Sequence, residues 1–342
     1  MFSVLMACWV LAKQTVSVMN LNELAAQNRL SRICPAPYWQ NYRWLDEKTV
    51  VAFVGDPSPY RSVWSQFTGD VKRVNIPKKQ IDRHFRLGSF WRRRSKTDAA
   101  KVVVSHLSLE RDRLIFYDLI GGANVSLQYV WDIAKDKEIK LPYGQGFTGR
   151  WLIFSKEKDT VIGINEVMYL KLTTAPRRYL YSYNLTTKQR TLLPVEKSAD
   201  GHEIGITTMG LDERGNLLAL SFEAKNHFRL FTLPLDKTPL TPISVQMPPV
   251  TDAVVGMEWS LSEDRKRLLW VFTDQNEEGT RTTTHLWVSQ SDGNGFHKWI
   301  TLTAAYEADF VPHIDGFHWM PGGRYISFLY EGDLYKLDAP SL

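Results

Sequence analysis

The chain has little cysteine and no long apolar segment. Its only cysteines, Cys8 and Cys34, cannot form a disulfide framework for 342 residues, so a disulfide scaffold is excluded. The longest apolar run covers residues 2–12, about half of the ~20 residues that a membrane-spanning helix needs. A content of 44% hydrophobic and 23% charged residues with a formal net charge of +5 is ordinary for a globular protein and excludes collagen, coiled coil and intrinsic disorder.

The sequence also lacks the signatures of several enzyme classes. It has no Gly-x-Ser-x-Gly turn, which presents the nucleophile of α/β-hydrolases. It has no phosphate-binding loop, dinucleotide fingerprint, His-Glu-x-x-His pair or EF-hand loop either. Asp292-Gly293-Asn294-Gly295 has the composition of a cation loop, but a hairpin turn explains it better. We therefore expect no metal and no cofactor.

The N-terminus leaves two interpretations open. Residues 2–12 have the length of an export-signal core, but no Lys or Arg precedes them, and Val10-Leu11-Ala12 matches a small-x-small cleavage site poorly. Residues 1–27 are therefore either a degenerate export signal, which predicts a periplasmic or extracellular protein, or an N-terminal arm packed on the fold of a cytoplasmic one.

Beyond residue 36 the chain predicts almost only β-strands, because short runs of Val, Ile, Leu and aromatic residues alternate with Gly, Pro, Asp and Asn. A unit of two strands and a tight turn recurs, in which Gly215 and Gly323 can take the positive φ of a hairpin. Its copies lie at 42–53, 106–117, 146–155, 209–222, 257–272 and 317–328.

A second pair of strands follows each copy. We expect third strands at 62–67, 126–132, 179–185, 228–236, 285–293 and 333–338, and fourth strands at 71–75, 138–142, 189–194, 240–244 and 297–302. The last unit lacks its fourth strand, and residues 28–35 resemble one. We therefore predict an all-β fold, a six-bladed β-propeller with four-stranded blades, in which the N-terminal strand completes the last blade and removes an exposed edge. A sandwich of unrelated hairpins is the alternative.

Part of the repeat resembles the repeat of TolB-type β-propellers. The stretch 286–301 is similar to its third strand, Asp-Gly turn and fourth strand, while Trp259-Ser260 and the stretch 319–323 are similar to its Trp-Ser-Pro-Asp-Gly segment. The resemblance covers residues 28–338 and implies a propeller at 28–342 as a single domain. It says little about function, because the same repeat occurs in periplasmic scaffolds, in the propellers of prolyl-oligopeptidase-like enzymes and in some polysaccharide lyases.

Several titratable residues precede the predicted innermost strands. In a propeller these connections surround the mouth of the central channel, so their side chains converge. Imidazoles and carboxylates together suit general acid–base chemistry or metal binding, although each of these residues alone is more simply a solvated loop residue. The channel-mouth candidates are His202, Glu203, Asp252, His313 and Asp315, with Asp309 beside them.

The positive charge is concentrated in one segment. Residues 78–96 contain eight Lys or Arg against Asp82 alone, whereas the rest of the chain has 34 basic and 36 acidic residues. We interpret residues 76–97 as a basic insertion. Basic side chains beside aromatic ones suit acidic groups, although a surface loop kept soluble by charge would look the same. The residues that we expect to bind a partner are Arg83, Arg86, Trp91, Arg92, Arg93 and Arg94.

These observations favour a noncatalytic binding platform over an enzyme. We expect a monomer without a membrane span, which binds a protein, an acidic surface or a glycan rather than nucleic acid, since a nucleic-acid module is usually more basic overall. The alternative is a channel-mouth enzyme, such as a polysaccharide lyase or hydrolase.

Overall fold

The computed structural model describes most of the chain. It covers residues 18–55, 69–85, 104–110, 113–119, 126–132, 135, 137–139, 141, 150–155, 157, 159–167, 177–201, 204–223, 227–249, 254–275, 281–305 and 314–340.

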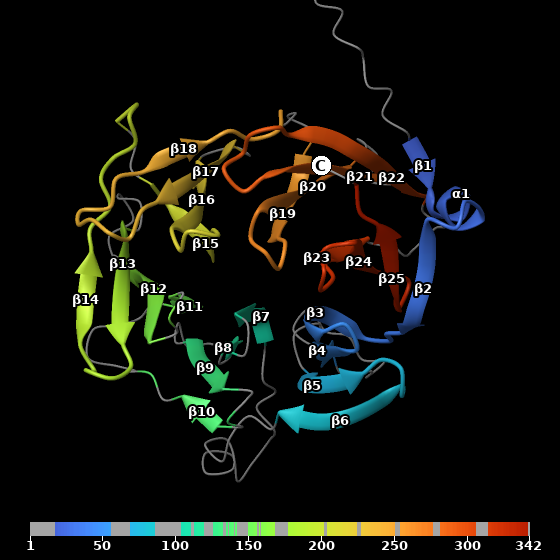
Figure 1. Ribbon diagram of the computed structural model, residues 1–342, viewed down its shortest axis with the longest axis horizontal. Helices are drawn as coiled ribbons and strands as arrows, with labels where there is room; N and C mark the ends of the chain where they lie inside the picture. Colours follow the sequence, from blue (N-terminus) through green and yellow to red (C-terminus); the bar gives the residue numbers. More distant parts are fainter. Residues whose placement is uncertain are drawn as a thin grey trace, which may run out of the picture.

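The described strands form a β-propeller, in which sheets are arranged radially around a centre (Figure 1). Five sheets have four strands each. They are β3 (Trp39–Asp46), β4 (Thr49–Gly55), β5 (Gly69–Asn75) and β6 (Gln80–Phe85); β7 (Val104–Glu110), β8 (Arg113–Leu119), β9 (Ser126–Asp132) and β10 (Lys137–Ile139); β11 (Arg150–Phe154), β12 (Thr160–Val167), β13 (Arg177–Asn184) and β14 (Arg190–Leu193); β15 (Ile206–Leu211), β16 (Leu217–Glu223), β17 (His227–Leu233) and β18 (Ile243–Val245); and β23 (Asp315–Trp319), β24 (Tyr325–Tyr330), β25 (Asp333–Asp338) and β2 (Leu30–Pro35).

One further sheet has five strands. It contains β19 (Val254–Leu261), β20 (Arg267–Gln275), β21 (Arg281–Gln290), β22 (His297–Ala305) and β1 (Val18–Asn20). The short strand β1 adds to β22 in parallel and pairs Val18 with Thr301. The prediction of six four-stranded blades is therefore wrong: the described residues form five such blades, and the N-terminal arm enlarges the remaining sheet.

The N-terminal segment closes the ring, as the strand count predicted. Strand β2 pairs antiparallel with β25, so that Leu30 lies opposite Leu337 and Pro35 opposite Asp333. Between β1 and β2 the chain forms the helix α1 (Leu21–Ala26). Its Leu24 is fully buried and packs with residues of both neighbouring sheets, so the arm ties the five-stranded sheet to the blade that β2 completes.

The first blade corrects the predicted strand assignment. Residues 69–75, expected in part as a fourth strand, form the third strand β5 and pair with β4. The fourth strand is β6, which lies inside the predicted basic insertion and pairs with β5. Both strands carry basic residues, Lys72 and Arg73 in β5 and Arg83 in β6, and β6 was therefore assigned to a charged insertion and not to a strand. The predicted third strand at 62–67 lies outside the described residues.

The hydrophobic core lies between neighbouring sheets. One cluster joins blade β11–β14 to blade β15–β18, and another joins the latter blade to the five-stranded sheet. A third cluster joins the five-stranded sheet to the blade of β23, and a fourth joins that blade to blade β3–β6. Because both faces of a blade are covered, the middle strands are apolar without alternation: residues 50–53 of β4 and 268–272 of β20 are buried throughout.

Candidate functional site

The innermost strands share a local irregularity. Each of these strands shifts its register against the second strand of its sheet, at Trp39/Asn41, Val104/Leu107, Trp151/Ile153, Ile206/Thr208, Val254/Gly256 and Asp315/His318. A β-bulge bends a strand and changes the direction of the following side chains, and bulges are frequent beside functional sites. The shared bulges therefore point to the centre of the propeller as the place of a functional site.

The repeat places three tryptophans against the preceding sheet. Trp44 donates a hydrogen bond from Nε1 to Oγ of Ser327 at 2.7 Å, and Trp319 donates from Nε1 to the Ser260 carbonyl oxygen at 3.2 Å. Trp259 packs on Gly210, where an added Cβ would come within 2.7 Å of the indole. Each tryptophan thus anchors an innermost strand to the preceding sheet. The side chain of the residue before it points to the opposite face of the strand.

The residues before these tryptophans are Arg43, Glu258 and His318, at equivalent positions of β3, β19 and β23. These three strands lie at the centre of the propeller (Figure 1). Strand β23 contacts both β19 and β3, so the three side chains come from adjacent sheets. We call this group the inner cluster. None of the three was among the site residues predicted from sequence.

Arg43 and His318 are joined directly. Nη1 of Arg43 lies 2.5 Å from Nε2 of His318, and the same atom donates to Oδ1 of Asn41 at 2.6 Å and to the Tyr42 carbonyl at 2.7 Å. Since a guanidinium can only donate, Nε2 of His318 accepts and the ring is neutral with its proton on Nδ1. Burial, and then the charge of Arg43, hold the pKa of His318 well below its usual value.

Glu258 adds a carboxyl group with an altered titration. Part of this residue is exposed to solvent, yet the protein around it desolvates the carboxyl group. This desolvation raises the pKa of Glu258, while the charge of Arg43 and a hydrogen bond from the Gly316 amide oppose the rise. Perturbed titratable groups gather at functional sites more often than elsewhere, so the inner cluster is our candidate site.

Tyr42 supports the inner cluster by packing against His318. Its ring meets the His318 ring edge-on, with centroids 5.0 Å apart, and its hydroxyl donates to Oγ of Ser327 at 2.8 Å. Ser327 also accepts from Trp44 and donates to the His318 carbonyl oxygen at 3.3 Å. This fully buried serine therefore holds β3 and β23 in register beside the cluster.

Most of the sequence-predicted site residues lie outside the described residues. This applies to His202, Glu203, Asp252, Asp309 and His313 and, in the basic segment, to Arg86, Trp91, Arg92, Arg93 and Arg94. Asp315 is the first residue of β23, and Arg83 lies in the outermost strand β6. Residues 86–103 therefore connect this outermost strand to the innermost strand β7 of the next blade.

Two features are absent from the described part of the chain. There, no group of three or more His, Cys, Asp or Glu side chains is placed to hold a metal ion. Among the same residues, no helix has the length and apolarity needed to cross a membrane.

Comparison with known proteins identifies no family. No protein-family model and no curated protein matches the chain. Similar solved structures include the β-propeller domain of Cps50 (Swd1) from Myceliophteria thermophila, with 11% identity, 91% of this chain and 99% of that chain covered and a TM-score of 0.49. Another is the β-propeller domain of the Trilobed protease from Pyrococcus furiosus, with 10% identity, 86% and 76% coverage and a TM-score of 0.46.

A chain of the Mitotic Checkpoint Complex is also similar, at 10% identity, 96% and 94% coverage and a TM-score of 0.49. These likenesses concern the fold alone, and the propeller itself rests on the sheet topology above. They do not single out the TolB-type repeat that the sequence resembles.

Proposed function

We propose that the protein is a noncatalytic binding platform that receives an acidic group of a protein or glycan at the inner cluster. The observation that carries this proposal is the placement of Arg43 beside a carboxyl group of raised pKa and a neutral imidazole, on three adjacent innermost strands. When Glu258 holds a proton, the cluster carries the single positive charge of Arg43. An acidic group then fits it, pairing with the guanidinium and sharing a proton with Glu258.

The basic segment supports the same choice of partner. Arg83 lies on the rim, and the residues 86–103 that follow connect the rim to the innermost strand β7. Eight basic residues between 78 and 96 would attract an acidic partner over a distance of about a Debye length, roughly 8–10 Å. The TolB-type resemblance is in accord with a scaffold outside the cytoplasm, which remains part of this proposal.

The proposal is tested with two acidic probes, poly-L-glutamate as a protein-like polymer and polygalacturonate as a glycan. Immobilised wild-type protein should bind at least one probe, and binding should tighten as the pH falls through the pKa of Glu258. The variant Arg92→Glu/Arg93→Glu/Arg94→Glu should bind more weakly and with less dependence on salt. The proposal would be refuted by a probe that binds three proteins with the same affinity: the wild type, the triple arginine variant and Glu258→Gln.

A second candidate function is acid–base catalysis at the same place. The observation in its favour is the pairing of a carboxyl group whose pKa is raised with an imidazole that stays neutral, because such groups act as general acid and general base. A lyase or hydrolase of acidic polysaccharides would use them. Ultraviolet detection of unsaturated products and a reducing-end assay on polygalacturonate distinguish the two functions, since turnover that Glu258→Gln abolishes would favour the enzyme.

A further inference from the structure

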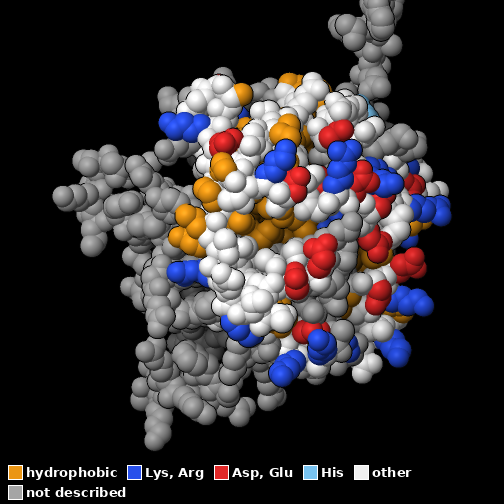
Figure 2. Space-filling view, turned by 60° about the vertical axis from the view of Figure 1, so that its left-hand side comes forward, with side chains coloured by type: hydrophobic (Ala, Val, Ile, Leu, Met, Phe, Trp, Pro, Cys, Tyr) orange, Lys and Arg blue, Asp and Glu red, His pale blue; other side chains and the backbone are white. Residues whose placement is uncertain are grey.

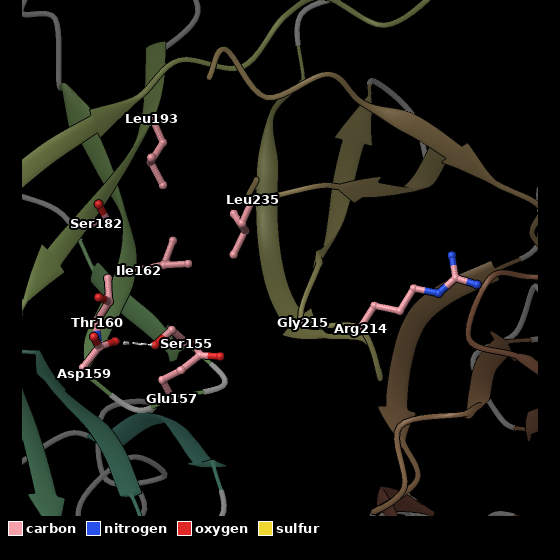
Figure 3. Close-up of a pocket in the computed structure, with 10 residues that line it drawn as sticks. All are labelled: Ser155, Glu157, Asp159, Thr160, Ile162, Ser182, Leu193, Arg214, Gly215 and Leu235. Carbon is pink, nitrogen blue, oxygen red and sulfur yellow. Dashed lines mark hydrogen bonds between the residues drawn. The ribbon is translucent and has the colours of Figure 1, made fainter. Parts of the chain in front are cut away.

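A pocket of about 290 Å³ lies between blade β11–β14 and blade β15–β18, away from the inner cluster (Figure 3). Its lining is divided by polarity. Leu193, Ile162 and Leu235 line one end, with Ile162 and Leu235 on opposite sides of the space. The turn between β11 and β12 supplies Glu157 and Asp159 at the other end.

The charged end is acidic. Glu157 and Asp159 are both exposed, and Oδ1 of Asp159 accepts a hydrogen bond from Oγ of Ser155 at 3.0 Å, which orients the carboxylate. Arg214 belongs to the wall of the opposite blade, but its guanidinium points away from these carboxylates (Figure 3). The pocket therefore has two carboxylates at one end and an apolar lining at the other.

The surroundings of the pocket suit contact with another protein. Figure 2 brings this side of the molecule forward and shows hydrophobic side chains gathered there, with acidic and basic ones around them. Clustered apolar side chains with a polar rim are typical of protein interaction surfaces.

We propose that this pocket receives a lysine or arginine side chain of a partner protein. Both residues carry an aliphatic stem that packs on apolar surface and a cationic head that stays in a polar environment. The stem would lie against Ile162, Leu193 and Leu235, and the head would form charge-assisted hydrogen bonds with Glu157 and Asp159. The division of the lining into an apolar and an acidic end matches this occupant, and the inference does not depend on the inner cluster.

The test uses N-acetyl-arginine amide and N-acetyl-lysine amide as probes with the full chain, measured by calorimetry. A single side chain should bind with a Kd on the order of 1 mM. N-acetyl-norleucine amide, which has the stem without the charge, and methylguanidinium, which has the charge without the stem, should each bind about tenfold more weakly or not detectably.

Variants locate the binding. Glu157→Gln/Asp159→Asn should weaken binding of the arginine probe about tenfold or more, and the side-chain amide that replaces the Asp159 carboxylate can still accept the hydrogen bond from Ser155. The matched control Glu47→Gln/Asp338→Asn makes the same change of charge at exposed positions of other blades and should bind as the wild type does. The proposal is overturned if the pocket variant binds like this control, or if neither amide binds while Mg²⁺ or Ca²⁺ does.

Discussion

Nη1 of Arg43 and Nε2 of His318 lie 2.5 Å apart, although 275 residues separate them in the chain. Strands β3 and β23 become neighbours only because β2 closes the ring by pairing with β25. The contact therefore connects the two ends of the propeller at its centre, and it determines which nitrogen of the imidazole carries the proton.

Replacing Arg43 with Met should raise the pKa of His318. Burial is the larger cause of the lowered pKa and the charge of Arg43 is the second, so the value should rise but stay below the usual 6.5. Titration of the histidine ring protons by NMR, with His318→Gln to assign the signal, measures this change. An unchanged pKa would show that Arg43 does not act on the imidazole.

Glu258 should give the folding stability a dependence on pH that Glu258→Gln removes. Its pKa is raised in the folded state, so this stabilising contribution is fully present below the usual value of 4.5 and is lost as the pH rises through the folded-state pKa. The Gln variant should melt at the same or a higher temperature at neutral pH, and its advantage should vanish in acid. Glu47→Gln, at an exposed turn, serves as the control and should show no such change with pH.

Ser327→Ala should lower the free energy of unfolding by roughly 2–4 kcal/mol, because buried hydroxyl and indole donors of Tyr42 and Trp44 lose their acceptor. Tyr42→Phe removes one of these bonds and should cost about 1 kcal/mol. Urea unfolding measures both. A loss no larger than that of Ser244→Ala, which changes an exposed strand serine, would contradict the role given to Ser327.

Removing the N-terminal segment tests closure in two steps. Deleting residues 1–29 removes β1 and α1, including the buried Leu24, whose burial contributes about 1.5–3 kcal/mol. Deleting residues 1–36 also removes β2 and leaves the edge of β25 unpaired. The second deletion should lower the urea midpoint further and broaden the transition, and equal midpoints for the full chain and the longer deletion would contradict closure by β2.

The sequence allowed prediction of those parts of the fold that short-range patterns determine. Gly215 and Gly323 occupy the predicted turns with φ of 86° and 66°, and β2 completes a blade because its apolar pattern matches that of a fourth strand. Strand β1 escaped prediction since only three residues pair, in parallel, with a distant strand. In the first blade, β6 lies in a segment rich in basic residues, so that segment was predicted as an insertion and β5 as the fourth strand.

The inner cluster could not be predicted from any local motif. Arg43, Glu258 and His318 lie far apart in the sequence, and each occurs in a segment recognised only as a repeat. Their shared position before a tryptophan was the available signal. This signal becomes informative only when the fold is known. The fold places the innermost strands β3, β23 and β19 next to one another, so that three equivalent positions form one site.

The most direct test of the proposed binding site is an NMR titration of histidine-labelled protein with poly-L-glutamate and polygalacturonate. If an acidic group enters the inner cluster, the His318 signal should shift with at least one probe, and it should shift less in the Arg43→Met variant. A probe that binds while the His318 signal stays in place, or no binding of either probe, would contradict the account.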